Sequence, residues 1–78
     1  MDYIYIYGKA NCPSCDEAKN LLSSHNLDFK YYQMGKDYDF GVFYSLAPKS
    51  HKWFPMITSK GDTEIYLGGL NDLKNHLA

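Results

Sequence analysis

Apolar residues along this chain fall into short blocks, and their spacing alternates between that of strands and that of helices. Residues 3–7 are all β-branched or aromatic, and no charge interrupts them, which predicts a central strand covered on both faces. From Cys12 the apolar positions repeat at helical spacing up to Asn26, a residue that tolerates the left-handed conformation at a helix end. Residues 28–33 then predict a second strand. A strand, a helix and a strand in succession predict a parallel pair with a right-handed crossover.

The middle of the chain is less regular. Gly35 and two nearby aspartates predict a loop, and a short helix is expected over roughly residues 39–47, where Pro48 stops it. Four apolar residues are spaced to line one face of that helix and to pack in the core, namely Phe40, Val42, Phe43 and Leu46.

The last part of the chain predicts an antiparallel hairpin and a helix. A third strand follows Pro55, a turn is expected at residues 59–62 with Gly61 supplying a positive φ, and a fourth strand covers residues 64–67. The final helix, residues 70–77, turns three leucines inward. The order β-α-β-α-β-β-α predicts an α/β fold in which helices flank both faces of a mixed four-stranded sheet.

Composition excludes several classes of protein. The chain has 78 residues, of which 45% are hydrophobic and 17% aromatic, enough for a single domain over residues 1–78. Its formal net charge is −1 and it has no basic run, which argues against nucleic-acid binding. No apolar run approaches the ~20 residues that cross a membrane, and no signal-peptide pattern is present. Two close cysteines without a targeting signal suit a reducing compartment, so a cytoplasmic location is expected.

The two cysteines form a C-x-x-C motif where the first strand gives way to the first helix. Pro13 has no N–H and a fixed φ, so it suits the first helical position and makes Cys12 the N-cap. The Cys12 sulfur then faces the free N–H groups of Ser14 and Cys15, which lowers the thiol pKa below its usual value of ~8.5. Lys9 adds a positive neighbour. We interpret Cys12 as a redox nucleophile and the less exposed Cys15 as its resolving partner.

Two other interpretations of the motif compete with redox chemistry. A zinc site needs two further ligands, and the three histidines, His25, His51 and His76, form no paired motif. The second alternative is a pair of inert cysteines. A proline between the cysteines at a strand-to-helix junction argues against both, so no metal is expected.

The chain resembles the glutaredoxins, which have the thioredoxin fold, over nearly its whole length. Three stretches carry the resemblance: Lys9-x-x-Cys12-Pro13-Ser14-Cys15, the Phe54-Pro55 step, and Gly68-Gly69-Leu70-Asn71-Asp72-Leu73. The resemblance implies a thioredoxin-like sheet and a small dithiol enzyme with the motif CPSC that passes electrons to disulfides. It also implies glutathione as a co-substrate, no permanently bound cofactor, and a monomer.

The resemblance also implies roles for single residues. Lys9 would meet a carboxylate of glutathione, and Phe54 would pair its backbone with the glutathione cysteine. Pro55 is expected to follow a cis peptide bond and to face the Cys12 sulfur. The N-terminal end of the last helix would receive the γ-glutamyl group, because a helix N-terminus attracts a carboxylate and an aspartate attracts an ammonium. The predicted glutathione-binding residues are Lys9, Ser14, Phe54, Pro55, Asn71 and Asp72.

Departures from the family pattern leave alternatives open. Ser14 stands where an aromatic residue is common, Phe54 replaces a smaller residue, and Trp53 stands where threonine is common, so the groove is reshaped. Lys9 as an ordinary solvated lysine and Asp72 as a partner of the helix dipole alone remain alternatives.

Three functions follow from these patterns. The first is a thiol–disulfide oxidoreductase that reduces protein disulfides or glutathione mixed disulfides and is recycled by glutathione, with ribonucleotide reductase as a client that the family suggests. The second is a redoxin of the same shape that is recycled by thioredoxin reductase and has no true glutathione site. The third is a binding module whose C-x-x-C is incidental or holds a metal.

Overall fold

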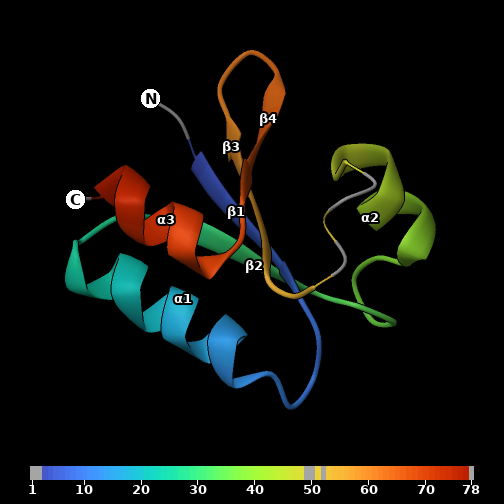
Figure 1. Cartoon of the computed structure of the whole chain (residues 1–78), viewed down its shortest axis with the longest axis horizontal. Coiled ribbons are helices and arrows are strands. Elements are labelled where there is room, and N and C mark those ends of the chain that lie inside the picture. Colours follow the sequence, from blue (N-terminus) through green and yellow to red (C-terminus); the bar gives the residue numbers. More distant parts are fainter. Residues whose placement is uncertain (1–2, 49–50, 52, 78) are drawn as a thin grey trace.

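The computed structural model describes residues 3–48, 51 and 53–77. Within them the elements follow the predicted order (Figure 1). They are β1 (Tyr3–Gly8), α1 (Pro13–Ser24), β2 (Phe29–Gln33), α2 (Phe40–Leu46), β3 (Met56–Lys60), β4 (Glu64–Gly68) and α3 (Leu70–Leu77).

The prediction of one domain over residues 1–78 also includes residues 1–2, 49–50, 52 and 78, which lie outside this description. Among the described residues, no helix combines the length and the apolar character needed to span a membrane.

The four strands form one mixed sheet in the order β2-β1-β3-β4, with β1 at its centre. β1 runs parallel to β2 and antiparallel to β3, while β3 and β4 form an antiparallel hairpin. Ile6 of β1 lies opposite Tyr31 of β2 on one side and Ile57 of β3 on the other. These pairings confirm the predicted parallel first pair, the final hairpin and the central position of the first strand.

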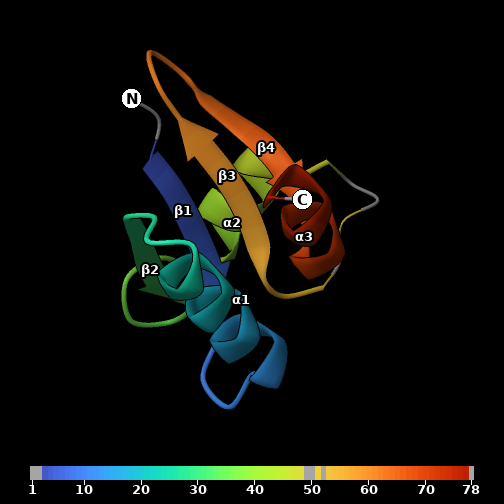
Figure 2. The same ribbon diagram turned by 90° about the vertical axis from the view of Figure 1, so that its left-hand side faces the viewer.

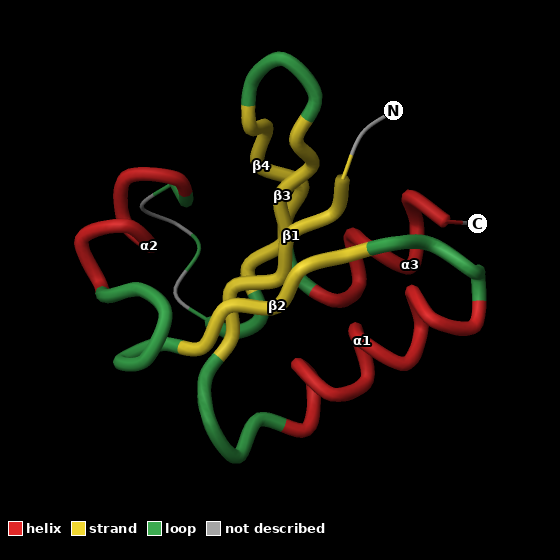
Figure 3. Tube along the Cα trace, turned by 180° about the vertical axis from the view of Figure 1, so that it is seen from behind, coloured by secondary structure: helices red, strands yellow, loops and turns green. Residues whose placement is uncertain are grey.

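Helices cover both faces of the sheet, as predicted. Figures 2 and 3 show α1 and α3 together on one face and α2 on the other. Ile4 and Ile6 of β1 point toward α1 and α3 and pack with Ala18, Leu22 and Leu73. Leu70 and Leu77 of α3 pack against the same cluster, so all three leucines of the last helix turn inward.

The face toward α2 is built from aromatic and hydroxyl-bearing side chains. Tyr5 and Tyr7 alternate with the two isoleucines of β1 and therefore point to this side. The hydroxyls of Tyr7 and Thr58 both donate to Glu64 Oε2, each at 2.6 Å. Burial, together with the neighbouring Glu64 carboxylate, raises the pKa of Tyr7. Tyr7 therefore stays protonated and continues to donate.

The short helix α2 differs in part from the prediction. It begins after Asp39, whose carboxylate accepts the Val42 N–H at 3.3 Å, and it ends before Pro48, as expected. Phe43 is 2% exposed, but Phe40 and Val42 are 55% and 40% exposed, so the expectation that both lie in the core is wrong. The helix has only seven residues, and one side of it reaches the sheet. The Phe40 ring instead stacks on the Tyr44 ring, with 5.8 Å between the two ring centroids.

The structure confirms the predicted end of α1 and corrects the predicted turn between β3 and β4. Asn26 has φ of 56°, which confirms the left-handed end of α1. β3 runs as far as Lys60, which pairs with Glu64, so the turn occupies residues 61–63 rather than 59–62. Gly61 is not among the residues of positive φ, so that prediction is wrong. Extending both strands to the Lys60–Glu64 pair leaves a three-residue turn, which Gly61 closes by donating its N–H to the Thr63 carbonyl at 3.2 Å.

Candidate active site

Cys12 occupies the N-cap of α1, as predicted. Its backbone is extended, with φ of −118° and ψ of 99°, and Pro13 follows at the first helical position. The Cys12 sulfur accepts the N–H of Cys15 at 3.3 Å. Because a thiolate accepts such a bond better than a thiol does, this contact favours the ionised form of a reduced Cys12.

A disulfide joins Cys12 and Cys15, whose α-carbons are 5.3 Å apart. Cys12 is 8% exposed and Cys15 is 1% exposed, which confirms that the second cysteine lies deeper. Two cysteines three positions apart in a first helical turn are therefore close enough to form and break a disulfide with little movement of the backbone.

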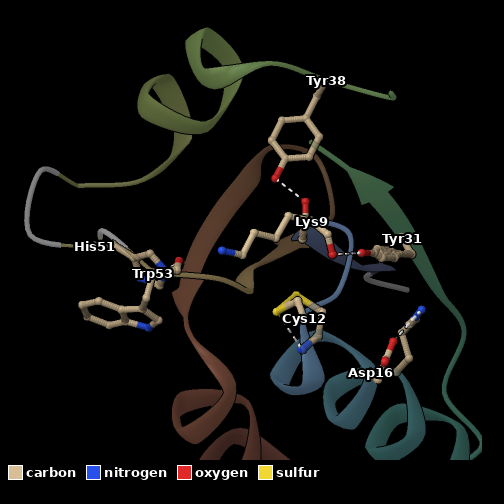
Figure 4. The surroundings of a disulfide bond; sticks show 10 residues. Lys9, Cys12, Asp16, Tyr31, Tyr38, His51 and Trp53 are labelled. Carbon is tan, nitrogen blue, oxygen red and sulfur yellow. Dashed lines mark hydrogen bonds and ion pairs between the residues drawn. A yellow bond between two sulfur atoms is a disulfide. The ribbon is translucent and has the colours of Figure 1, made fainter. Parts of the chain in front are cut away.

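Two tyrosines that the sequence did not single out hold the loop before the cysteines. Tyr31 of β2 donates its hydroxyl to the Lys9 carbonyl at 3.1 Å, and Tyr38 donates to the Gly8 carbonyl at 2.9 Å. Figure 4 shows both rings reaching toward this loop. Burial raises the pKa of both tyrosines, so both hydroxyls keep their protons and remain donors. No local sequence signal marks them, because Tyr31 comes beside the loop through the pairing of β2 with β1, and Tyr38 through the turn that follows β2.

The lysines near the cysteines lie against aromatic rings. The Lys9 ammonium lies 5.3 Å from the centroid of the Phe54 ring, and its side chain extends toward Trp53 and His51 in Figure 4. The Lys19 ammonium lies 4.2 Å from the centroid of the Tyr31 ring. Lys9 is exposed and has this one aromatic contact, so the alternative of a solvated lysine remains open.

Five of the six residues predicted to bind glutathione line one groove. They are Ser14, Phe54, Pro55, Asn71 and Asp72, and Trp53, Gly69 and Leu70 complete the lining of a hollow of about 330 Å³. The Phe54–Pro55 peptide bond is cis, as predicted. The sixth residue, Lys9, lines a second hollow of about 310 Å³ together with Cys12. The structure thus brings together three distant segments of the chain at one groove.

Asp72 has a structural partner within the groove. Its Oδ2 accepts the N–H of Gly69 at 2.9 Å. This bond supports the alternative in which Asp72 stabilises the start of α3. A carboxylate accepts several hydrogen bonds, so this contact leaves capacity for a ligand ammonium.

His51 is the residue of this region that sequence reasoning missed. It is 1% exposed, its Nε2 lies 2.8 Å from the Trp53 carbonyl, and its Nδ1 meets the Tyr66 hydroxyl. Burial lowers the pKa of His51, against the opposing effects of backbone hydrogen bonds and the charge of Asp72. The imidazole is therefore neutral at pH 7. A single histidine in an irregular segment gives no signal of such a role.

The described residues contain no group of three or more histidine, cysteine, aspartate or glutamate side chains arranged to hold a metal ion. The chemistry that their geometry supports is thiol–disulfide exchange at Cys12, with Cys15 within bonding reach.

A family model matches part of this sequence, and two solved structures share its fold. The family model described as Glutaredoxin matches residues 4–42, half of the chain. Glutaredoxin 1 from Francisella tularensis, crystallised with cacodylate, is similar with a TM-score of 0.71 and 23% identity, over 99% of this chain and 93% of that one. Reduced glutaredoxin from Escherichia coli is similar with a TM-score of 0.72 and 24% identity, over 96% and 92%. No curated protein matches the sequence significantly.

Proposed function

This chain belongs to the glutaredoxin family, and on that premise we propose that it uses glutathione to reduce protein disulfides or glutathione mixed disulfides. Family, fold and cysteine pair make it a thiol–disulfide oxidoreductase. The observation that carries the proposal is the position of Cys12. Cys12 is the N-cap of α1, and its sulfur accepts the Cys15 N–H. Cys12 lines one hollow together with Lys9, and Ser14, two positions later, lines the groove that holds the other residues expected to bind glutathione.

The reaction proceeds by two exchanges at the Cys12 sulfur. The Cys12 thiolate attacks one sulfur of the substrate disulfide, a Cys12–substrate disulfide forms, and the other substrate sulfur leaves as a thiolate with the electron pair. The Cys15 thiolate then attacks Cys12, which forms the Cys12–Cys15 disulfide and releases the second substrate thiolate. Two molecules of glutathione regenerate the dithiol and become oxidised glutathione, so two electrons pass in each cycle.

The polar end of the groove supports glutathione as the co-substrate. Asn71 and Asp72 lie at the start of α3, where the helix dipole favours a carboxylate and the aspartate favours an ammonium. A γ-glutamyl group carries both charges on one carbon. Lys9, on the other side of Cys12, supplies a cation for the glycine carboxylate.

The aromatic side chains of the same groove support an alternative to glutathione as the electron donor. Trp53 and Phe54 stand where the family pattern has smaller residues, and both line the groove. The alternative is therefore a redoxin that thioredoxin reductase recycles.

As further proposals, the protein acts as a cytoplasmic monomer, and its clients include protein disulfides such as that of ribonucleotide reductase.

The test supplies glutathione, glutathione reductase and NADPH as the only source of electrons, with a mixed disulfide of glutathione and cysteine as the substrate. We expect NADPH oxidation that depends on the protein and is lost in Cys12→Ser. A parallel reaction contains thioredoxin reductase and NADPH without glutathione. Turnover only in the parallel reaction would reject glutathione dependence and support the alternative, and turnover in neither would reject both.

A further inference from the structure

Trp53 is an exposed aromatic residue that the fold nevertheless holds in one place. It lines the groove together with Ser14, which stands between the two cysteines in the sequence, and 53% of its surface is exposed. Its indole stacks on the His51 ring at 4.2 Å, with 29° between the planes. Ordinary exposed side chains rotate freely, whereas this one rests on a buried ring. A fixed and exposed tryptophan within a groove is typical of an anchor for a bound partner.

His51 holds Trp53 through its backbone as well as through its ring. A carbonyl oxygen only accepts, so the His51 Nε2 must carry the proton that it donates to the Trp53 carbonyl at 2.8 Å. In the neutral ring, Nδ1 then accepts from the Tyr66 hydroxyl. Both ring nitrogens are therefore satisfied, and His51 is a fixed link between β4 and the segment that carries the indole.

Gly69 leaves room for the edge of the indole. A β-carbon at Gly69 would lie 2.5 Å from Trp53 Nε1, closer than the two atoms can approach. The indole edge therefore lies directly against the backbone at the start of α3. Phe54 supplies a second aromatic wall, and its own ring is held by Phe43 at 5.0 Å. The groove thus presents two immobilised aromatic surfaces close to its polar end.

We propose that Trp53 determines the substrate specificity of this groove, and that it selects polypeptide disulfides with an aromatic or branched aliphatic residue next to the reacting cysteine. His51 is the positioning residue that holds the indole. The inference rests on the proposed function and specifies the substrate class of the same site. An apolar side chain that stacks on the indole gains stabilisation that glutathione cannot obtain, because glutathione carries no such side chain.

The test compares four disulfide substrates with dithiothreitol as the electron donor, so that glutathione dependence does not enter. Three are symmetric peptide disulfides in which the cysteine is preceded by phenylalanine, followed by phenylalanine, or flanked by glycine on both sides. The fourth is oxidised glutathione. We expect kcat/KM for at least one phenylalanine peptide to exceed that for the glycine peptide by about two- to thirteenfold, the range of an aromatic pair.

Variants separate the indole from general effects on the groove. Trp53→Ala is expected to remove the preference for phenylalanine. His51→Phe keeps a ring beneath the indole but loses the hydrogen bond to the Trp53 carbonyl. The ratio of kcat/KM for the phenylalanine and glycine peptides should therefore lie between those of the native chain and of Trp53→Ala. Tyr44→Ala is the matched control, because Tyr44 is 60% exposed and aromatic but lies on α2 outside the groove. It should leave both the preference and the absolute rates unchanged.

A spectroscopic measurement tests the same contact without changing the indole. Trp53 is the only tryptophan of the chain, so its fluorescence reports on this site alone. In Cys15→Ser, each peptide can be trapped as a mixed disulfide on Cys12. We expect the Trp53 emission to shift to shorter wavelength with a phenylalanine peptide but not with the glycine peptide.

The possible failures are distinguishable. Equal rates for all peptides in the native chain, an unchanged preference in Trp53→Ala, or equal emission in the two trapped complexes would overturn the inference and leave the oxidoreductase intact. Reduction of none of the four disulfides would overturn the proposed function instead. If Trp53→Ala does not fold, the rates of the native chain and the trapped complexes still decide the question.

Discussion

The Cys15 sulfur lies directly against the backbone of Gly8. A β-carbon at position 8 would be 2.7 Å from Cys15 Sγ and 2.9 Å from the Tyr31 hydroxyl. The end of the central strand and the first turn of α1 therefore meet at a point where no side chain fits. The close contact fixes the depth of Cys15 and, through the disulfide, the position of Cys12.

Gly8→Ala is expected to destabilise the oxidised protein by about 1–3 kcal/mol, the usual cost of forcing an extra methyl group into a packed site. The same methyl group should displace Cys15 and slow the reduction of protein disulfides. Urea unfolding and a disulfide reductase assay measure the two effects. Gly41→Ala is the control, because Gly41 lies in α2 away from the cysteines, and alanine favours a helix by up to about 1 kcal/mol. Equal stability of Gly8→Ala and the native chain would contradict the packing argument.

The two cysteines should differ in their mutants. Cys12→Ser is expected to reduce disulfide reductase activity to background on every substrate, because it removes the attacking sulfur. Cys15→Ser should lose the reduction of protein disulfides but keep part of the turnover of glutathionylated substrates, because glutathione itself can resolve that mixed disulfide. Initial rates on both kinds of substrate provide the measurement. Equal loss in both mutants on glutathionylated substrates would count against these roles.

Alkylation of the reduced protein should show an order. Cys12 accepts the Cys15 N–H and is the more exposed of the two, so iodoacetamide should modify it first. Mass spectrometry of peptides after short reaction times reports the order directly. Denatured protein, in which the helix start is lost, serves as the control and should show similar rates at both cysteines. Faster modification of Cys15 in the folded protein would refute the N-cap argument.

The Glu64 carboxylate should stabilise the fold through its two donors. Glu64→Ala leaves the hydroxyls of Tyr7 and Thr58 without their acceptor, and both residues are buried, so a loss of about 3 kcal/mol is expected. Glu17→Ala is the matched control. Its partner Lys74 lies at 3.2 Å, but both side chains are exposed, so removal of this pair should cost less than about 1 kcal/mol. Urea unfolding measures the free energy of unfolding of both variants. Similar decreases in the two would contradict the claim that the buried hydrogen bonds to Glu64 stabilise the fold more than an exposed ion pair does.

Stability should fall in mild acid because of His51. Burial lowers its pKa in the folded state, so the unfolded chain binds the proton first, near the ordinary pKa of ~6.5. The contribution of neutral His51 to the free energy of unfolding is therefore complete above about pH 6.5. It is lost as the pH falls below that value, at no more than about 1.4 kcal/mol per pH unit. Urea unfolding of the native chain between about pH 7.5 and 5.5 measures the slope. His51→Asn should flatten the slope and the exposed His25→Asn should not; an unchanged slope in His51→Asn would assign the effect elsewhere.

Much of the fold could be predicted because local rules decide it. The uninterrupted β-branched and aromatic run at residues 3–7 predicted a central strand, and the alternation of isoleucine and tyrosine puts the two kinds of side chain on opposite faces. Pro13 predicted where α1 begins and made Cys12 its N-cap, and Asn26 marked its end. Each of these features depends on the backbone preference of a residue and its neighbours.

The errors arose where tertiary packing overrode local spacing. Phe40 and Val42 have the spacing of core residues, yet the sheet receives only one side of the seven-residue helix α2 and leaves both exposed. The turn near Gly61 moved because strand pairing continued to Lys60 and Glu64. In both places a contact with another element decided the outcome, and no short window of sequence contains that contact.

The sequence by itself determined the cysteine pair, the start of its helix and the order of helices and strands along the chain, because these depend on neighbouring residues. Only the tertiary structure decided what surrounds the cysteines. Tyr31 reaches their loop through strand pairing and Tyr38 through the turn after β2. His51 holds Trp53 beside Gly69 through contacts between separate segments. Such contacts are properties of the folded surface, because they form only when distant parts of the chain are packed together.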